Sequence, residues 1–399
     1  MVKKLTSLLI LGVLSFFLTG CWDQVEIEDR GFIVGVAMDL VEETDDESDK
    51  PEGKYRYKGT YQFVVPAGLS QNGSGPSGGG GSEKAYENVS STSDSLLEQA
   101  RNLAVKMSRP PFAQHLQLLI VSEEVAKEPR SFRNIMDLFI RDNEMRRGII
   151  VMIAEGEAGS ILDAQSKNES LPAIHLSDIA ENTIKNSEML SKVRLGFVHE
   201  RLVDQTSFVI PKVTMEGQHV NMTGAAVFQG YNDQMIDFIN GDTTEGLNFI
   251  TGEYKGGLIK TKVEDELVVY DIRNASRKIR VDVRNKESIH FNIVIETEGI
   301  IGESFKSLDY ANPTVLSKVE ETVEKEIKRK VLETINTFQK DLQVDALGLG
   351  GYLQSEDYKT WKQIKQNWDR GVNYFSKSTI HVQVKSIVRS SGAVFESQK

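Results

Sequence analysis

Hydrophobic residues are most concentrated at the N-terminus, over residues 5–18, directly after Lys3 and Lys4. As a helix this stretch would span about 21 Å, which is less than the roughly 30 Å hydrocarbon core of a bilayer. Thr19 and Gly20 are small and precede a cysteine. The pattern therefore predicts a secretory signal peptide over residues 1–20 and not a membrane-spanning anchor.

The next apolar positions indicate two strands. Residues 32–38 are continuously apolar, and residues 55–65 alternate apolar and polar side chains, so a long hairpin is expected. The acidic loop 42–52 between them lacks the ligand spacing of a calcium loop, so a solvated loop is favoured over a cation site. Residues 66–84 are rich in Gly and Ser and predict a flexible surface loop. Their G-x-G-x-x-G spacing is interrupted by Pro76, which disfavours nucleotide binding.

Further along, helical and strand patterns alternate. Helices are expected at 93–107, 123–128 and 132–148, and strands at 115–122 and 149–156. These elements predict an N-terminal α+β domain over residues 22–200.

A small middle domain is predicted over residues 201–262. Its expected hairpin turns at 230–233, and a helix follows with Asp242 as N-cap and Glu245 completing a capping box. Residues 263–399 predict a C-terminal α+β domain with strands near 266–272, 277–283, 288–299 and 378–392.

The longest helix is expected at about 313–342. Asn312 is its predicted N-cap, and an apolar residue recurs every fourth position from Val315 to Ile335. Three i,i+4 pairs are expected on its exposed side: Glu321–Lys325, Glu324–Lys328 and Glu326–Lys330. A coiled-coil partner is the weaker alternative, because a spacing of four does not sustain a heptad seam. The predicted fold class is multi-domain α+β, with about three domains and mixed or antiparallel sheets packed against helices.

Composition supports packed domains and limits the partners. The chain has 399 residues, 39% of them hydrophobic, and a formal net charge of −11. Such an acidic chain repels phosphate backbones, so nucleic-acid binding is disfavoured. A single cysteine excludes an internal disulfide framework and a cysteine-based zinc site.

That cysteine, Cys21, ends the stretch Leu18-Thr19-Gly20-Cys21, which matches a bacterial lipobox. The match predicts cleavage between Gly20 and Cys21 and lipidation of the Cys21 thiol. Two acyl chains hold a protein stably on a membrane, whereas one binds only marginally. The alternative is an ordinary secreted protein with a chance cysteine.

The sequence contains no recognisable catalytic residue, metal site or cofactor motif. The six histidines lack ligand spacing, and no nucleophile elbow or phosphate loop occurs. One dense charged stretch is a possible partner contact or, as the favoured interpretation, a structural ion-pair network. This charge cluster comprises Asp137, Arg141, Asp142, Arg146 and Arg147, with Glu144 among them. Trp361 and Trp368 are expected in the core.

Several stretches in order resemble the Ger(x)C family of spore germination lipoproteins. The residues that carry the resemblance are Gly20-Cys21-Trp22-Asp23, Glu26-Ile27 and Asp39, then His115, Ala126, Asp137, Arg141, Asp142 and Arg146-Arg147, and finally Trp361, Trp368, Asp369 and Gly392. The departures are the longer loop at 66–84 and the stretch 347–350, where the family usually has Phe-Gly.

The resemblance implies a three-domain lipoprotein without established enzymatic activity, the C subunit of a nutrient germinant receptor. It implies the outer face of the spore inner membrane as location, with acyl chains on Cys21 in that membrane. The implied partners are the A and B integral membrane subunits, and the implied role is in nutrient-triggered germination. The alternatives are a solute-binding lipoprotein of a transport system, which needs two similar lobes around a cleft, and a cell-envelope hydrolase.

Overall fold

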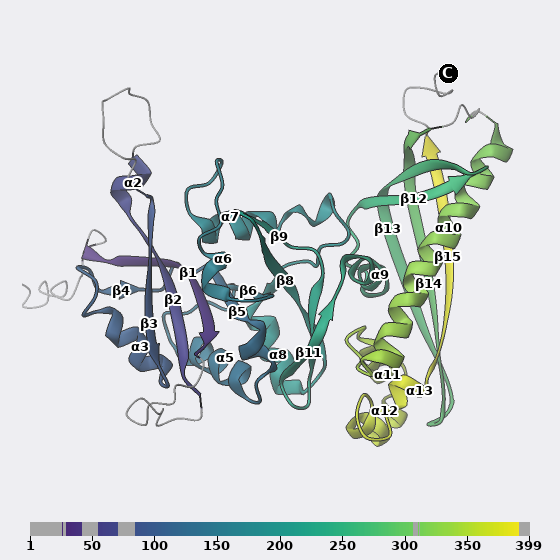
Figure 1. Ribbon diagram of the computed structural model, residues 1–399. Coiled ribbons are helices and arrows are strands. Elements are labelled where there is room, and N and C mark those ends of the chain that lie inside the picture. The colour runs from purple at the N-terminus through teal and green to yellow at the C-terminus, as the bar shows by residue number, and fades with distance from the viewer. Residues whose placement is uncertain are drawn as a thin grey trace, which may run out of the picture.

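The computed structural model describes residues 26, 29–41, 55–70, 84–305, 310 and 312–390. The predicted signal peptide, Cys21, the acidic loop and most of the Gly-rich loop lie outside these residues. Within them the chain is α+β, as predicted, and is built around two separate sheets (Figure 1).

The first sheet has 11 strands, and its main path runs β11-β10-β8-β6-β5-β1-β2-β3. The bounds along that path are β11 Gln234–Ile239, β10 Ala225–Gln229, β8 Phe208–Glu216, β6 Ile150–Ala154, β5 Leu118–Ser122, β1 Gly31–Leu40, β2 Tyr57–Val64 and β3 Tyr86–Ser93. Short strands β4 Pro111–Phe112, β7 Val193–Arg194 and β9 His219–Asn221 pair beside β1, β6 and β8.

The expected hairpin is confirmed, because β1 and β2 pair antiparallel from Ile33↔Phe63 to Leu40↔Tyr57. The helix predicted to start at residue 93 is wrong at its N-terminal end. Residues 86–93 form edge strand β3, and the helix α3 (Leu96–Leu103) begins after N-cap Ser95. Strand β3 is rich in Ser and Thr and so lacks the apolar alternation that would indicate a strand.

Helices cover both faces of this sheet, and alternate strand residues serve the two faces. Val36 and Met38 of β1 pack in the core that contains α5 (Ser131–Arg141) and α8 (Leu195–Asp204). Their neighbour Ala37 packs in a second core, with α6 (Ala158–Ile161) and α7 (Pro172–Ile179). The helices α2 (Pro66–Ser70) and α4 (Glu123–Lys127) also belong to this unit and have five residues each.

The first sheet continues beyond residue 200, the expected end of the first domain. β8 pairs parallel with β6 and antiparallel with β10, so residues 208–239 extend the same sheet. The predicted turn at 230–233 joins β10 to β11 as expected. A separately folding middle domain over 201–262 stays a prediction.

The second sheet has four strands in the order β12-β13-β14-β15. β12 (Gly257–Val263), β13 (Glu266–Asn285) and β14 (Ser288–Ser304) are antiparallel neighbours, and β15 (Thr379–Ser390) pairs parallel with β14. The two strands expected between 266 and 283 are one, because β13 runs through with local register shifts near Ile272.

The long helix α10 (Pro313–Asn336) lies along this sheet (Figure 1). Asn312 caps it by accepting from the Thr314 N–H at 2.9 Å, and a π-helical turn at 337–341 follows, close to the predicted end at 342. The apolar residues that recur at every fourth position from Val319 to Ile335 are all buried. The short helices α11 (Leu349–Glu356), α12 (Tyr358–Ile364) and α13 (Tyr374–Lys377) lead to β15.

Not all of the ion pairs expected on the exposed face of α10 are formed. Glu321 and Lys325 pair at 2.7 Å, as predicted. Glu324 instead accepts from the Ser386 N–H at 3.0 Å, and Glu320 accepts from the Val388 N–H at 2.9 Å. These carboxylates satisfy backbone donors on the outer side of edge strand β15, which would otherwise be open to strand addition.

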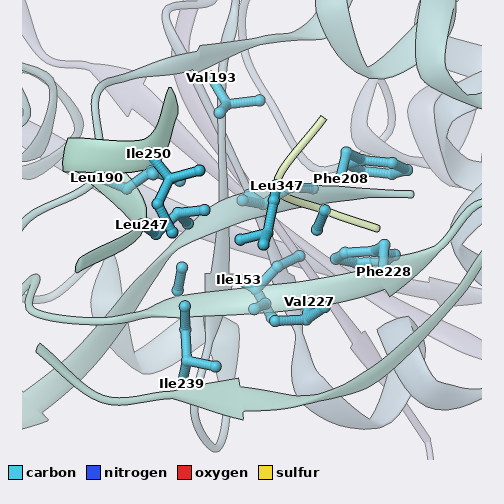
Figure 2. Close-up of a cluster of buried hydrophobic side chains, with 14 of the residues drawn as sticks. Ile153, Leu190, Val193, Phe208, Val227, Phe228, Ile239, Leu247, Ile250 and Leu347 are labelled. Atoms are coloured by element: carbon cyan, nitrogen blue, oxygen red, sulfur yellow. The ribbon is translucent and has the colours of Figure 1, made fainter. Parts of the chain in front are cut away.

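The two sheets share one continuous hydrophobic core through the helix α9 (Gly241–Thr251). Figure 2 shows part of this core, to which Leu247 and Ile250 of α9, Ile153 of the first sheet and Leu347 of the C-terminal segment all belong. All four side chains are fully or almost fully buried. The parts are therefore packed together and not merely connected by linkers.

Candidate functional site at the junction of the two sheets

Helix α9 is fixed to α10 by a buried ion pair. Lys330 Nζ lies 2.8 Å from Glu245 Oε2, and the Glu245 side chain is only 3% exposed. Glu245 also accepts from the Ser187 hydroxyl at 2.6 Å. Burial alone would lower the Lys330 pKa, but its bonds to Asp242 and Glu245 outweigh that effect and raise the pKa.

The predicted capping box at this helix is wrong. Asn240 is the N-cap and accepts from the Thr243 N–H at 2.9 Å. Asp242 lies in the first turn and pairs with Lys330, which holds the Asp242 pKa below its usual range. Both acids that the local pattern assigned to the cap, Asp242 and Glu245, instead pair with Lys330 of α10. The predicted Glu326–Lys330 pair does not form. Glu326 bonds Arg329 instead.

The helices α9 and α10 approach so closely that a side chain cannot stand between them. A Cβ at Gly246 would lie 2.1 Å from Thr334 Oγ1, which is well inside van der Waals contact. The Thr334 hydroxyl instead donates to the Thr243 carbonyl at 3.1 Å. The junction therefore depends on a glycine at position 246.

A second polar connection joins the first sheet to the segment before α11. The Ser207 hydroxyl, just before β8, donates to Asp369 at 2.5 Å, and the Asp345 N–H lies 3.4 Å from the same carboxylate oxygen. Ser207 in turn accepts from the Gly230 N–H at 3.1 Å. One chain of hydrogen bonds thus crosses from the β10–β11 turn to the C-terminal unit, which comprises the strands β12–β15 and the helices α10–α13.

Asp345 is the buried acid of this connection. It accepts from Trp368 Nε1 and the Gly350 N–H, both at 2.6 Å, and from the Leu349 N–H at 3.0 Å. Burial raises its pKa to about 6 despite these three donors. Trp368 is buried, as expected, and its ring meets Trp361 edge-on at 5.8 Å between centroids.

We expect Asp345→Asn to change the pH dependence of stability. The folded chain holds the Asp345 proton up to about pH 6, whereas the unfolded chain releases it near 3.8. The stability from this proton is therefore full below pH 3.8 and is lost as the pH rises through 6. The advantage of wild type over Asp345→Asn, measured by urea unfolding, should shrink by about 2 kcal/mol between pH 4.5 and 7.5.

Asp357→Asn is the matched control for that experiment. Asp357 caps α12, and its bonds with the Thr360 N–H and hydroxyl lower its pKa. Its pH dependence should have the opposite sign and a lower window: the wild-type advantage grows as the pH rises towards the ordinary carboxyl value of 3.8 and is almost level between pH 4.5 and 7.5. A difference between wild type and Asp345→Asn that stays constant with pH would contradict the buried titration.

The predicted charge cluster divides into local contacts. Arg141 Nε donates to Asp137 at 2.6 Å on the surface of α5, with the two side chains 76% and 53% exposed. Asp142 accepts from the Glu144 N–H at 2.8 Å, and Arg147 reaches Glu200 of α8 at 3.4 Å. Arg146 forms no ion pair among the described residues. The exposed Asp137–Arg141 pair is the part available to a partner, and both interpretations of the cluster stay open.

Asp39, which the sequence placed only at a strand end, has a defined structural contact. Its carboxylate accepts from the Ala158 and Gly159 N–H groups at 2.6 and 2.9 Å, where α6 begins. Burial raises its pKa, although these two bonds and the charge of Lys58 counteract the effect. The contact joins residues about 120 positions apart, which local sequence patterns do not reveal.

The described residues contain no group of three or more His, Cys, Asp and Glu side chains placed to hold a metal ion. Of their helices, none is long and apolar enough to cross a membrane. His290 and His381 stack on neighbouring strands with ring centroids 6.3 Å apart, and His115 packs against Phe32.

Two unlike sheets, fixed to each other by buried polar contacts, define a multi-domain α+β protein. Comparison with known families gives its class. The model of the spore germination protein N-terminal domain matches residues 23–215, and the model described as spore germination B3/GerAC like, C-terminal, matches residues 223–392. The chain belongs to the Ger(x)C family of spore germination proteins, whose members are C subunits of germinant receptors.

Relatives match over almost the whole chain. Spore germination protein YndF of Bacillus subtilis is 33% identical, covering 98% of both chains. Spore germination protein A3 of the same organism is 26% identical over 96% of this chain and 97% of its own. The fold is also that of the crystal structure of the GerBC protein, with a TM-score of 0.60 at 19% identity, covering 88% of this chain and 97% of the other.

Proposed function

We propose that this chain is the lipid-anchored, non-catalytic C subunit of a spore germinant receptor. The observation that carries the proposal is the match of both family models along the chain, beginning two residues after the predicted lipidation site at Cys21. In the proposed arrangement, acyl chains on Cys21 hold the protein on the outer face of the spore inner membrane. The folded units then contact the membrane-embedded A and B subunits.

Anchoring by lipid is supported by the sequence at residues 18–21 and by the physical requirements of membrane attachment. Two acyl chains supply enough buried hydrocarbon for stable attachment. A non-catalytic role is supported by the family, whose members are receptor subunits and not known enzymes. The solute-binding alternative is less favoured, since an 11-stranded and a four-stranded sheet do not make two similar lobes.

Affinity purification from dormant-spore membranes tests the assembly. We expect a C-terminally tagged chain, solubilised in mild detergent, to recover two polytopic membrane proteins in constant ratio. Untagged spores serve as the background control, and an unrelated tagged spore lipoprotein controls for co-solubilised membrane proteins. Recovery of the tagged chain alone, or of a transporter's subunits, would count against the receptor assignment.

A further inference from the structure

A groove of about 620 Å³ lies between the first sheet's helix α8 and the C-terminal unit. Its apolar walls include Phe197, Phe208, Leu347 and Tyr352, which come from both units. Small-molecule sites commonly have volumes of about 300–1,000 Å³ and a mostly apolar lining with a few polar groups. The groove has the size and the lining of such a site.

The groove is rich in cations although the chain as a whole is acidic. Arg147, Lys192, Arg194, Arg201 and Arg277 line it, against the acids Glu200 and Glu253. Arg147 pairs with Glu200, and Lys192 pairs with Glu181. The guanidinium groups of the other three arginines have no carboxylate within ion-pair distance among the described residues. Burial, and to a smaller extent the charges of Arg194 and Lys255, lower the pKa of Lys192.

Two polar atoms in this groove are enclosed without a hydrogen-bond partner in the described part of the chain: Arg277 Nε and Ser191 Oγ. The Arg277 guanidinium is held in place, since one of its nitrogens donates to the Thr251 carbonyl at 2.5 Å and its carbon lies 5.2 Å from the Tyr352 ring centroid. An enclosed polar group without a partner is unfavourable, so nearly all such groups in folded proteins are paired. The fixed Arg277 guanidinium and the Ser191 hydroxyl therefore have hydrogen-bonding capacity left for a ligand.

Arg201 adds a second cation from the opposite unit. It lies on α8, with its guanidinium carbon 4.7 Å from the Phe197 ring centroid, and it donates to Thr206 Oγ1 at 3.4 Å. Within the described part of the chain, no carboxylate pairs with the remaining donors of its guanidinium. Arginine and carboxylate form paired, charge-assisted hydrogen bonds, which are about twice as strong as neutral ones.

We propose that this groove binds a small anionic ligand, a carboxylate carried on an apolar body. Arg277 and Arg201 bind the carboxylate, Ser191 donates a further hydrogen bond, and the aromatic walls pack on the apolar part. The site is independent of the proposed receptor assembly. A groove that binds nothing would leave the co-purification result unchanged.

Equilibrium dialysis of the full mature lipoprotein in detergent micelles at pH 7.5 tests the site, with radiolabelled benzoate as probe and empty micelles as blank. We expect saturable binding with a Kd on the order of 1 mM, which benzamide at equal concentration does not displace because it lacks the charge. Arg277→Gln should weaken binding at least about tenfold. Arg284→Gln, an exposed arginine on the same strand and outside the groove, should bind as wild type does.

Arg201→Gln provides a second variant, from the other unit, if Arg277→Gln fails to fold by circular dichroism. It too should weaken benzoate binding several-fold. The proposal is overturned by non-saturable uptake, by equal competition from benzamide, or by unchanged affinity in a folded arginine variant. Equal losses in Arg284→Gln and Arg277→Gln would also overturn it, since that result would indicate a general effect of surface charge.

Discussion

Replacing Lys330 with methionine should lower the free energy of unfolding by about 3–5 kcal/mol, because it leaves a buried carboxylate without its counter-charge. Glu245 is 3% exposed, and its remaining partners, the Ser187 and Tyr254 hydroxyls, are neutral. The lost pair joins α9 to α10, so the change weakens the junction of the two sheets. Urea unfolding followed by tryptophan fluorescence measures the effect, because Trp361 and Trp368 lie in the C-terminal unit.

Lys325→Met is the matched control on the same helix. Lys325 is 70% exposed and, among the residues that the structure describes, pairs with Glu321 alone, so its loss should cost no more than about 0.5 kcal/mol. The double variant Lys330→Met with Glu245→Gln should recover part of the loss, since no unpaired buried charge remains. Equal costs for Lys330→Met and Lys325→Met would show that the junction does not depend on the buried pair.

Changing Cys21 to alanine should release the protein from spore membranes and abolish its nutrient-triggered germination. The physical reason is that alanine offers no thiol for acylation, and the proposed membrane attachment depends on the acyl chains. Fractionation of spore membranes measures the first effect, and the fall in optical density after nutrient addition measures the second.

Thr19→Ser controls for changes near the cleavage site, because it keeps a small residue there and leaves the cysteine in place. Fusing the Cys21→Ala chain to an unrelated transmembrane helix separates attachment from a specific role of the lipid. Recovery of germination would show that attachment alone is needed. Normal germination by a soluble Cys21→Ala protein would refute the anchoring proposal.

Much of the fold could be predicted from local periodicity. The β1–β2 hairpin, the α10 helix with its Asn312 cap and the turn at 230–233 each have a pattern within a few neighbouring residues. Strand β3 could not be predicted in this way because it is polar and lies at a sheet edge. The pairing of β6 with β8 could not be predicted either, because it joins parallel strands about 60 residues apart, where no local turn signal exists.

The candidate sites likewise differ in whether adjacent residues or distant residues form them. Lipidation at Cys21 was predicted from four adjacent residues, and it stays a prediction because Cys21 lies outside the described residues. The contacts of Lys330 with Asp242 and of Asp39 with Gly159 join positions 88 and 120 residues apart, so no spacing rule could indicate them. The groove with Arg277 and Arg201 likewise exists only once the two units are packed together.

The distance along the chain between β14 and β15 has a consequence for folding during synthesis. β15 supplies the parallel neighbour of β14, although about 90 residues separate Asn292 from His381. The second sheet therefore cannot close until β15, at residues 379–390, has left the ribosome. Until then the apolar face of α10 and the free edge of β14 are open to other chains. A nonsense mutation shortly before residue 379 should thus cause aggregation or proteolysis of the truncated chain, because β14 then lacks its parallel neighbour.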